Sequence, residues 1–359
     1  MKKIIPHVTP LLFKNRLTEL TYFTTNTCNM KCKHCFVMDE LNSEIEPLLS
    51  VEEIIKMGKY IPNMQRVHLG GGEPFIRKDM PELVVALSEN WKTGVICIPT
   101  NGWFTKNILK TIEAFGKKGY GTLRIHFSIN SFIPEDMDNF TQVKNSFKNW
   151  CKSVEEAKKI TAKYDNITLV ALTTYNEYNQ QYFIQLIDFL LDDIGVDDFS
   201  FQLVREHGDY KPYLDVDGFD NAIKYFFKHK SKDNSLLKAF RSLIREETSE
   251  YYKNPKYTTP CMAGTTRVVM SPNGDIYPCE KLGYPNLDRD KYLMGSIRDF
   301  NYDITKLLKN NESTTIQDTI YLDKCHCDHG IDASLSQLSN MKFKFKLATR
   351  TIKNFVFTK

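Results

Sequence analysis

The chain has 359 residues, of which 42% are hydrophobic and 26% are charged. These values are typical of a globular protein, and the length suits a barrel-sized domain with a smaller appendage. A net charge of +4 does not indicate a nucleic-acid partner, and without a run of about 18 uncharged apolar residues we expect no membrane span.

Cysteine content bears on the cellular compartment. The chain has nine cysteines, and residues 1–16, MKKIIPHVTPLLFKNR, lack the continuous apolar stretch and the cleavage site of a signal peptide. In a reducing compartment, clustered cysteines bind metal or take part in chemistry more often than they form disulfides. We therefore expect a cytoplasmic protein with metal-binding or reactive cysteines.

Strand and helix patterns alternate over the first 205 residues. Apolar runs and β-branched or aromatic residues predict strands at 19–25, 66–70, 94–99, 122–130, 166–174 and 198–204. Helices are predicted between them, at 50–61, 79–91, 105–118, 142–164 and 178–193, and Ser50 with Glu53 forms a capping-box signature. Because a complete barrel needs eight such units, six predict an α/β fold with an open, partial (β/α)6 barrel.

The last third of the chain has a different pattern. Residues 215–250 are predicted to be mostly helical, 266–279 to form a β-hairpin around the turn PNGD, and 302–310 and 313–321 to be helical. We expect a small C-terminal α+β domain. The predicted limits are 1–17 for an N-terminal extension, 18–210 for the barrel, 211–255 for a helical linker region, 256–335 for the α+β domain and 336–359 for a tail.

The tail is basic and has helical periodicity. Residues 341–359 contain no acid and six cations, Lys342, Lys344, Lys346, Arg350, Lys353 and Lys359. Its apolar residues with helical spacing are Met341, Phe345, Ala348, Ile352 and Phe355. This pattern predicts an amphipathic helix, which either docks on its own protein or contacts a peripheral membrane surface or an acidic partner.

Three cysteines follow the first predicted strand, in the sequence TTNTCNMKCKHCF. Cys28, Cys32 and Cys35 have the spacing C-x3-C-x2-C. Structural zinc sites close with four ligands, so these thiolates either belong to a zinc site that is completed elsewhere or leave one metal position open. A cubane 4Fe–4S cluster held by three cysteines has one iron that can bind an external ligand.

A second motif, GGEP at Gly71, Gly72, Glu73 and Pro74, follows the second predicted strand. At the carboxyl ends of parallel strands, the two motifs lie where such sheets carry their chemistry. Together they resemble the radical SAM superfamily, and the resemblance covers about residues 18–330. It implies a 4Fe–4S cluster on the three cysteines, with S-adenosylmethionine (SAM) bound to the free iron. It also implies reductive cleavage of SAM to a 5′-deoxyadenosyl radical, with electrons from a flavodoxin- or ferredoxin-type donor.

The resemblance further implies which residues bind SAM. Glu73 would accept a hydrogen bond from the methionyl ammonium group, and the glycines would let the backbone approach the ligand. His34 stands where the family usually has an aromatic residue near the adenine. The remaining candidates are Pro74 and three residues at strand ends that would contact the ribose and the carboxylate, namely Ser128, Asn130 and Arg205.

Four further cysteines, Cys261, Cys279, Cys325 and Cys327, lie in the last third of the chain. The segment CMAGTTRVVMSPNGDIYPC resembles the start of the auxiliary-cluster extension called SPASM, or its shorter form, twitch. Four cysteines suffice for one auxiliary 4Fe–4S cluster, and a four-thiolate zinc site is the alternative. In CHCDHGI, Gly330 or Ile331 stands where related proteins have a further cysteine, which argues against a second auxiliary cluster.

Cys97 in the third predicted strand and Cys151 in the long helix remain. Both are expected to be buried small apolar residues. If Cys97 points into the barrel, it could instead donate a hydrogen atom to a substrate radical, as some radical epimerases require.

Three functional hypotheses follow. The first is crosslinking, oxidation or epimerisation of a ribosomally synthesised peptide. The second is dehydrogenation or epimerisation of a small molecule, such as a sugar, an aminoglycoside or a lipid-linked precursor. The third is a non-catalytic iron–sulfur or zinc scaffold, against which the intact GGEP motif argues. The fold alone does not choose among substrates.

Overall fold

The computed structural model describes residues 16–43, 47–61, 63–207, 210–285, 289–327, 334 and 336–356. Within these ranges the chain forms two compact units. The barrel unit comprises the described residues of Asn15–Leu172 and Ala263–Thr319, and the helical unit comprises Thr173–Met262 and the described residues from Ile320 onward. The predicted domain limits stay a prediction.

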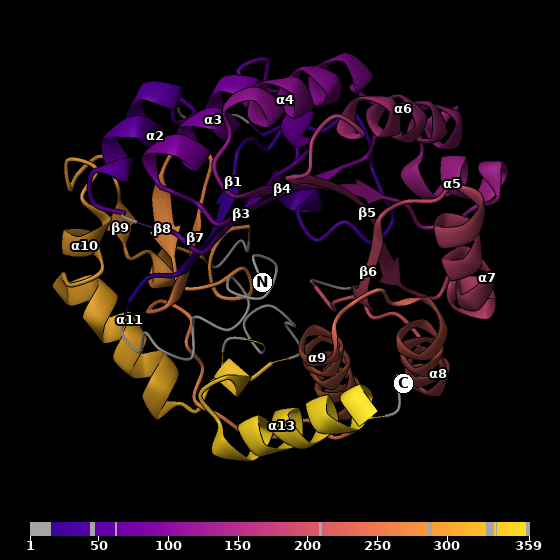
Figure 1. The fold of residues 1–359 in the computed structure, drawn as a ribbon. Coiled ribbons are helices and arrows are strands. Elements are labelled where there is room, and N and C mark those ends of the chain that lie inside the picture. Colours follow the sequence, from indigo (N-terminus) through magenta and orange to yellow (C-terminus); the bar gives the residue numbers. More distant parts are fainter. Residues whose placement is uncertain are drawn as a thin grey trace. The chain divides into compact units, whose positions relative to one another are not determined.

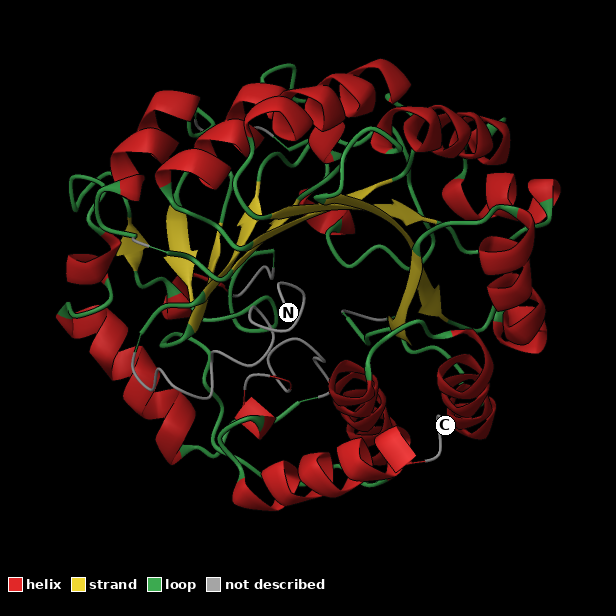
Figure 2. Cartoon of the chain, in the orientation of Figure 1, coloured by secondary structure: helices red, strands yellow, loops and turns green. Residues whose placement is uncertain are grey.

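The barrel unit is built on a curved sheet (Figure 1; Figure 2). Its strands are β1 (Glu19–Phe23), β2 (Arg66–Gly70), β3 (Val95–Thr100), β4 (Thr122–Ser128), β5 (Ile167–Tyr175), β7 (Arg267–Met270), β8 (Asp275–Tyr277) and β9 (Gly295–Ser296). They are ordered β5-β4-β3-β2-β1-β7-β8-β9. All pairs from β5 to β7 are parallel, whereas β8 and β9 join antiparallel. The sheet does not close, so the predicted partial barrel is confirmed.

Helices cover the convex side of this sheet, namely α2 (Val51–Gly58), α3 (Met80–Asn90), α4 (Thr105–Lys118) and α6 (Ser146–Thr161) (Figure 1). Strand alternation explains the arrangement, because successive side chains point to opposite faces. Phe127 of β4 is fully buried and meets the ring of Trp150 in α6. Arg124 and His126, on the other face of β4, are only partly buried. The concave face of the sheet is therefore partly polar.

The helix predicted over 142–164 is confirmed as α6, and a shorter helix that was not predicted, α5 (Pro134–Thr141), precedes it. Gln142 and Asn145, between the two helices, have φ angles of 58° and 65°. The Asp138 carboxylate accepts hydrogen bonds from the Asn145 N–H at 2.6 Å and from the Ser146 hydroxyl at 2.8 Å. This left-handed turn ends α5 before α6 begins. The capping box of α2 is confirmed, with reciprocal bonds between Ser50 and Glu53.

The predicted hairpin is confirmed as β7 and β8, but β7 also pairs in parallel with β1, which the sequence did not predict. The Arg267 guanidinium of β7 is buried and donates to the Thr21 hydroxyl at 2.7 Å and to Glu280 at 3.1 Å. The helix predicted over 302–310 is limited to α10 (Ile304–Leu307). The hairpin thus belongs to the sheet of the barrel unit.

The helical unit contains the end of β5 from Thr173 and the strand β6 (Asp198–Leu203). Its helices are α7 (Phe183–Asp188), α8 (Val216–Tyr225), α9 (Ser235–Lys253) and α13 (Met341–Val356), and α11 (Asn311–Leu322) runs into it from the barrel unit. Aromatic rings form its core. The stacked rings of Phe199 and Phe201 in β6 are 5.2 Å apart, and Phe226 meets both edge-on.

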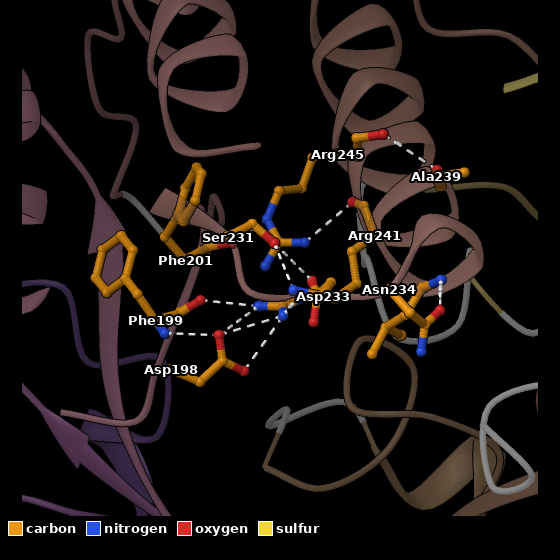
Figure 3. Close-up of polar contacts among 11 residues, drawn as sticks. Asp198, Phe199, Phe201, Ser231, Asp233, Asn234, Ala239, Arg241 and Arg245 are labelled. Atoms are coloured by element: carbon orange, nitrogen blue, oxygen red, sulfur yellow. Dashed lines mark hydrogen bonds and ion pairs between the residues drawn. The ribbon is translucent and has the colours of Figure 1, made fainter. Parts of the chain in front are cut away.

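Two arginines of α9 form ion pairs and hydrogen bonds with β6 (Figure 3). Arg241 pairs with Asp198 at 3.2 Å and with Asp233 at 2.6 Å. Arg245 donates to the carbonyl oxygen of Phe201 at 3.0 Å and lies over the ring of the same residue. Burial, reinforced by the charge of Arg241, lowers the pKa of Arg245 to about 9. Arg241 and Arg245 therefore connect α9 to β6 inside the helical unit.

The basic tail forms α13, which packs on α9. Phe343 and Leu347 are buried with Ala239 and Leu243 of α9. A docked terminal helix is therefore confirmed. The apolar row named from the sequence is not the docked face, because Phe345 and the other large residues of that row remain exposed. Within the described parts of the chain, no helix has the length and hydropathy needed to cross a membrane.

Candidate active site

The loops that follow β1 and β2 are bonded directly to each other. The N–H of Gly72 donates to the Thr25 carbonyl at 2.8 Å, and the N–H of Glu73 donates to the Thr27 carbonyl at 2.9 Å. A Cβ on Gly72 would overlap the Thr27 oxygen, and one on Gly71, where φ is 125°, would overlap the Thr25 oxygen. The two glycines of GGEP thus let one backbone approach another, which the sequence did not predict.

The three cysteines lie on the first of these loops, and their side chains are half-buried. The pKa of Cys28 is raised to about 11, chiefly by burial and to a smaller degree by the neighbouring charges of Glu73 and Cys35. Burial also raises the pKa of Cys32, with smaller contributions from Cys35 and Cys28. The three thiols therefore lie close enough to influence one another. Binding metal at this loop must release their protons.

The donor set of this loop can be compared with the needs of an iron–sulfur cluster. Nowhere in the described residues do three or more His, Cys, Asp or Glu side chains converge on a position for one metal ion. A cubane cluster does not need such convergence, because its three thiolates bind three different iron atoms. The donor set of Cys28, Cys32 and Cys35 on one loop is thus compatible with a 4Fe–4S cluster.

The end of α5 supports the outer side of the cysteine loop. The N–H groups of Lys31 and Lys33 donate to the carbonyls of Thr141 and Phe140, at 3.1 and 3.2 Å. The ring of His34 packs on the ring of Phe140, with 4.9 Å between centroids. The loop is therefore attached to the barrel on both sides. A contact between His34 and adenine stays a prediction.

Glu73 is buried and accepts three hydrogen bonds from the barrel unit. Oε1 accepts from the Phe75 N–H at 3.1 Å and from the Thr100 hydroxyl at 2.8 Å, and Oε2 accepts from the Asn101 N–H at 2.7 Å. Burial raises the pKa of Glu73 to about 7, although these three donors act in the opposite direction. A carboxylate has about four acceptor positions, so roughly one is left for a ligand.

Two asparagines join this site without having been predicted as site residues. The Asn101 side chain donates to Oδ1 of Asn29 at 2.9 Å, and its backbone donates to Glu73. Nδ2 of Asn29 is buried and has no hydrogen-bond partner among the described residues. Since an unsatisfied buried donor costs about 1–3 kcal/mol, this amide is available to a ligand. Only its position between the cysteines could have indicated Asn29.

The remaining predicted residues are distributed over both units. Ser128 ends β4 and Asn130 is buried two residues later, at the carboxyl edge of the barrel sheet. Arg205 belongs to the helical unit. Cys97 is buried, and its register with His68 and Arg124 puts it on the concave face of the sheet.

Burial raises the pKa of the Cys97 thiol. Cys151, on α6, is only half-buried, so the expectation of full burial was wrong for this residue.

A cavity in the helical unit is lined by three of the four cysteines predicted for an auxiliary cluster, Cys261, Cys325 and Cys327. Its wall is held by a hydrogen bond from the Met262 N–H to the Ser336 hydroxyl at 3.1 Å. The fourth, Cys279, is buried in the barrel unit, where its sulfur accepts from the Leu282 N–H. Gly330 and Ile331 lie outside the described residues.

Comparison with known proteins identifies the barrel. The family model of the radical SAM superfamily matches residues 22–190. GTP 3′,8-cyclase from Nautilia profundicola is 25% identical over 286 residues, which are 74% of this chain and 82% of that protein. The antilisterial bacteriocin subtilosin biosynthesis protein AlbA from Bacillus subtilis is 23% identical over 85% of this chain, which spans only 64% of AlbA.

Among solved structures, SuiB from Streptococcus suis bound to S-adenosylmethionine has the same fold. It aligns with a TM-score of 0.60 and 16% identity, covering 89% of this chain and 69% of SuiB. An identity this low supports the fold alone. The family match contains both the cysteine loop and GGEP, so residues 22–190 form a radical SAM domain, of the superfamily that uses SAM and a 4Fe–4S cluster.

Proposed function

We propose that this radical SAM enzyme modifies a ribosomally synthesised peptide by crosslinking, oxidation or epimerisation. The observation that carries the proposal is the similarity to AlbA, a bacteriocin biosynthesis protein, over 85% of this chain and thus well beyond residues 22–190. SuiB has also been solved with its precursor peptide SuiA, and that structure aligns with a TM-score of 0.58 over 88% of this chain.

The residues of the cysteine loop have defined tasks in this proposal. Cys28, Cys32 and Cys35 hold the 4Fe–4S cluster. The free acceptor position of Glu73 receives the SAM ammonium group, and the buried Nδ2 of Asn29 donates to an acceptor on SAM. When bound, the cluster would supply the electron for reductive cleavage of SAM, and thereby the radical chemistry that removes a hydrogen atom from the substrate. His34, Gly71, Gly72, Pro74, Ser128 and Asn130 complete the proposed SAM site in the barrel unit, and Arg205 stays a candidate from the sequence. A flavodoxin- or ferredoxin-type protein is the proposed electron donor.

A second metal centre is part of the same proposal. The cavity with Cys261, Cys325 and Cys327 holds one auxiliary 4Fe–4S cluster. Cys279 stays the fourth ligand that the sequence predicts. Such a cluster either takes an electron from the substrate or orients it. The buried Cys97 on the concave face is the proposed hydrogen-atom donor if the reaction is an epimerisation. Zinc at the auxiliary cysteines would leave a redox-neutral reaction.

A small-molecule substrate is the second candidate, and one observation favours it. The GTP 3′,8-cyclase of Nautilia profundicola, whose name describes a nucleotide substrate, is aligned over 82% of its length. A short cysteine- or glycine-rich reading frame beside the gene would support the peptide, and genes for sugar or lipid synthesis would support the small molecule. A non-catalytic scaffold is not supported, because the superfamily consists of enzymes.

Metal analysis after anaerobic reconstitution tests both metal centres. The wild-type chain should contain about eight irons, and the Cys28/Cys32/Cys35→Ala variant about four. That variant should form no 5′-deoxyadenosine, whereas Cys325→Ala with Cys327→Ala should form it without product. Deoxyadenosine from the triple variant would refute the role of the cysteine loop. Zinc in place of the second four irons would refute the auxiliary cluster.

The substrate is tested with the reconstituted enzyme, SAM and a chemical reductant. A peptide encoded beside the gene should stimulate 5′-deoxyadenosine formation, and mass spectrometry should show the peptide two hydrogen atoms lighter or, in deuterated water, carrying one deuterium. GTP is tested in the same assay as the alternative substrate. Stimulation by GTP and not by the peptide would replace the peptide proposal with the small-molecule one.

A further inference from the structure

The outward face of α13 carries large apolar side chains that the helical unit does not cover. Met341, Phe345, Ile352 and Phe355 are 73%, 73%, 63% and 64% exposed. With the exposed Ala348 they recur at intervals of three or four residues, so they form one row along the helix. We call these five residues the outer stripe. At 1.5 Å per residue, the outer stripe is about 20 Å long.

The outer stripe lies opposite the face by which α13 is docked. Phe343 and Leu347 are buried against α9, and Lys346 and Arg350 pair with Glu247 and Glu246 of the same helix. Because successive residues are about 100° apart around a helix, the row of Phe343 and Leu347 and the row of Phe345 and Ile352 face roughly opposite directions. Packing of the helical unit therefore explains one apolar row of α13 and leaves the other largely exposed to solvent.

Lysines border the outer stripe on both sides. The helical period puts Lys342 and Lys353 along one side of it and Lys344 along the other. None of these three lysines forms an ion pair with any described residue, whereas Lys346 and Arg350 pair with Glu247 and Glu246 of α9. Residues 341–356 include no acid. The outer stripe is thus an apolar row between uncompensated positive charges.

We propose that the outer stripe binds the surface of a membrane that contains anionic lipids. Helices of this kind lie flat in the interface, with apolar side chains between the head groups and acyl chains. The lysines on both sides would then reach the lipid phosphates, and each positive charge near an anionic surface adds to the attraction. Because α13 is already folded on α9, binding does not have to supply the free energy of helix formation.

Charge disfavours the other occupants of this face. A second copy of α13 would bring its own lysines against those of the first, and like charges in contact are repulsive. A protein groove would need acidic residues along both sides of an apolar floor. A bilayer with anionic head groups supplies both features over any area, so it matches a straight stripe about 20 Å long without further shape requirements.

Sedimentation of the full-length protein with vesicles tests the proposal. The wild-type chain should bind phosphatidylcholine vesicles that contain phosphatidylglycerol, bind poorly to pure phosphatidylcholine and be released by salt. Phe345→Ser with Ile352→Ser, and separately Lys342→Glu with Lys353→Glu, should each weaken binding more than about tenfold. Tyr213→Ser, which changes another exposed side chain of the helical unit, is the matched control and should bind like wild type.

Unchanged circular dichroism and unchanged 5′-deoxyadenosine formation should show that the variants remain folded and active, because α13 contains no residue of the proposed active site. Equal vesicle binding by the wild-type chain and the Phe345→Ser/Ile352→Ser variant would overturn the proposal. It would also be overturned if wild type ignores vesicles and sediments as a dimer that the variant abolishes, since the stripe would then join two copies. Loss of enzyme activity in every variant with normal vesicle binding would contradict it as well.

Discussion

The buried carboxyl group of Glu73 gives a prediction with a defined sign. Burial raises its pKa from 4.5 to about 7 in the folded protein. Between these two pH values, the folded protein binds a proton that the unfolded chain does not. The free energy of unfolding therefore falls as the pH rises from about 4.5 to about 7, and at about 1.4 kcal/mol per pKa unit the loss is about 3 kcal/mol.

Glu73→Gln isolates this contribution. Glutamine is a close counterpart of the protonated carboxyl group but does not ionise, so the variant lacks this part of the pH dependence. All other titrating groups are common to both proteins and cancel in the difference. The free energy of unfolding of the variant minus that of wild type should therefore increase by about 3 kcal/mol between pH 4.5 and pH 7.5.

Urea unfolding of the cofactor-free protein at several pH values, followed by circular dichroism, measures this difference. Glu89→Gln, at an exposed position of α3, is the control for the chemical change and should show no such trend. A constant difference between the Glu73→Gln variant and wild type would refute the reasoning. It would mean that the donors from Phe75, Thr100 and Asn101 keep the carboxylate ionised in spite of its burial.

Gly72→Ala should abolish SAM binding, measured by calorimetry on the reconstituted protein, because the new Cβ would overlap the Thr27 oxygen and separate the two loops. Gly70→Ala, whose Cβ would lie 3.8 Å from the nearest atom, should bind SAM normally; equal binding by both variants would contradict the interlocked backbones. Arg241→Leu should lower the free energy of unfolding by about 3–5 kcal/mol in urea, since it removes the cation that pairs with two partly buried carboxylates. Lys159→Leu breaks an exposed ion pair and should change the free energy of unfolding little. Similar losses for the two variants would contradict the proposed stabilising role of Arg241.

The sequence predicts local elements of this fold better than their pairing. The strands of the barrel and helix α4 lie within a few residues of their predicted limits, because alternation and helical periodicity are local properties. The break between α5 and α6 depends on Asp138 accepting bonds from residues beyond it. The pairing of β7 with β1 joins residues far apart in the chain, and no local pattern contains it.

The packed face of the tail helix could not be predicted from the sequence. Both the row of Phe343 and Leu347 and the outer stripe satisfy helical spacing, so periodicity predicts the helix without choosing the face that packs. Which face packs depends on α9, where Glu246 and Glu247 pair with Arg350 and Lys346. These ion pairs favour the orientation in which Phe343 and Leu347 face α9. An amphipathic pattern with two apolar rows is therefore ambiguous from sequence alone.

The candidate site was predictable where a motif marks it. Cys28, Cys32 and Cys35 and the GGEP sequence stand out by spacing. The tasks of individual side chains were not predictable to the same degree. Three acceptor positions of Glu73 are occupied by hydrogen-bond donors of the barrel unit. Asn29 is connected to this site because its side-chain oxygen accepts a hydrogen bond from Asn101. These contacts join loops after three different strands, so they exist only once the sheet has formed.

The attachment of the cysteine loop couples the three thiols to the rest of the barrel unit. Bonds from Gly72, Glu73, Lys31 and Lys33 link this loop to the loop after β2 and to the end of α5. The thiols therefore do not change position independently of these two elements. A substitution at the end of α5, remote from the cysteines in sequence, would then alter the geometry of all three together.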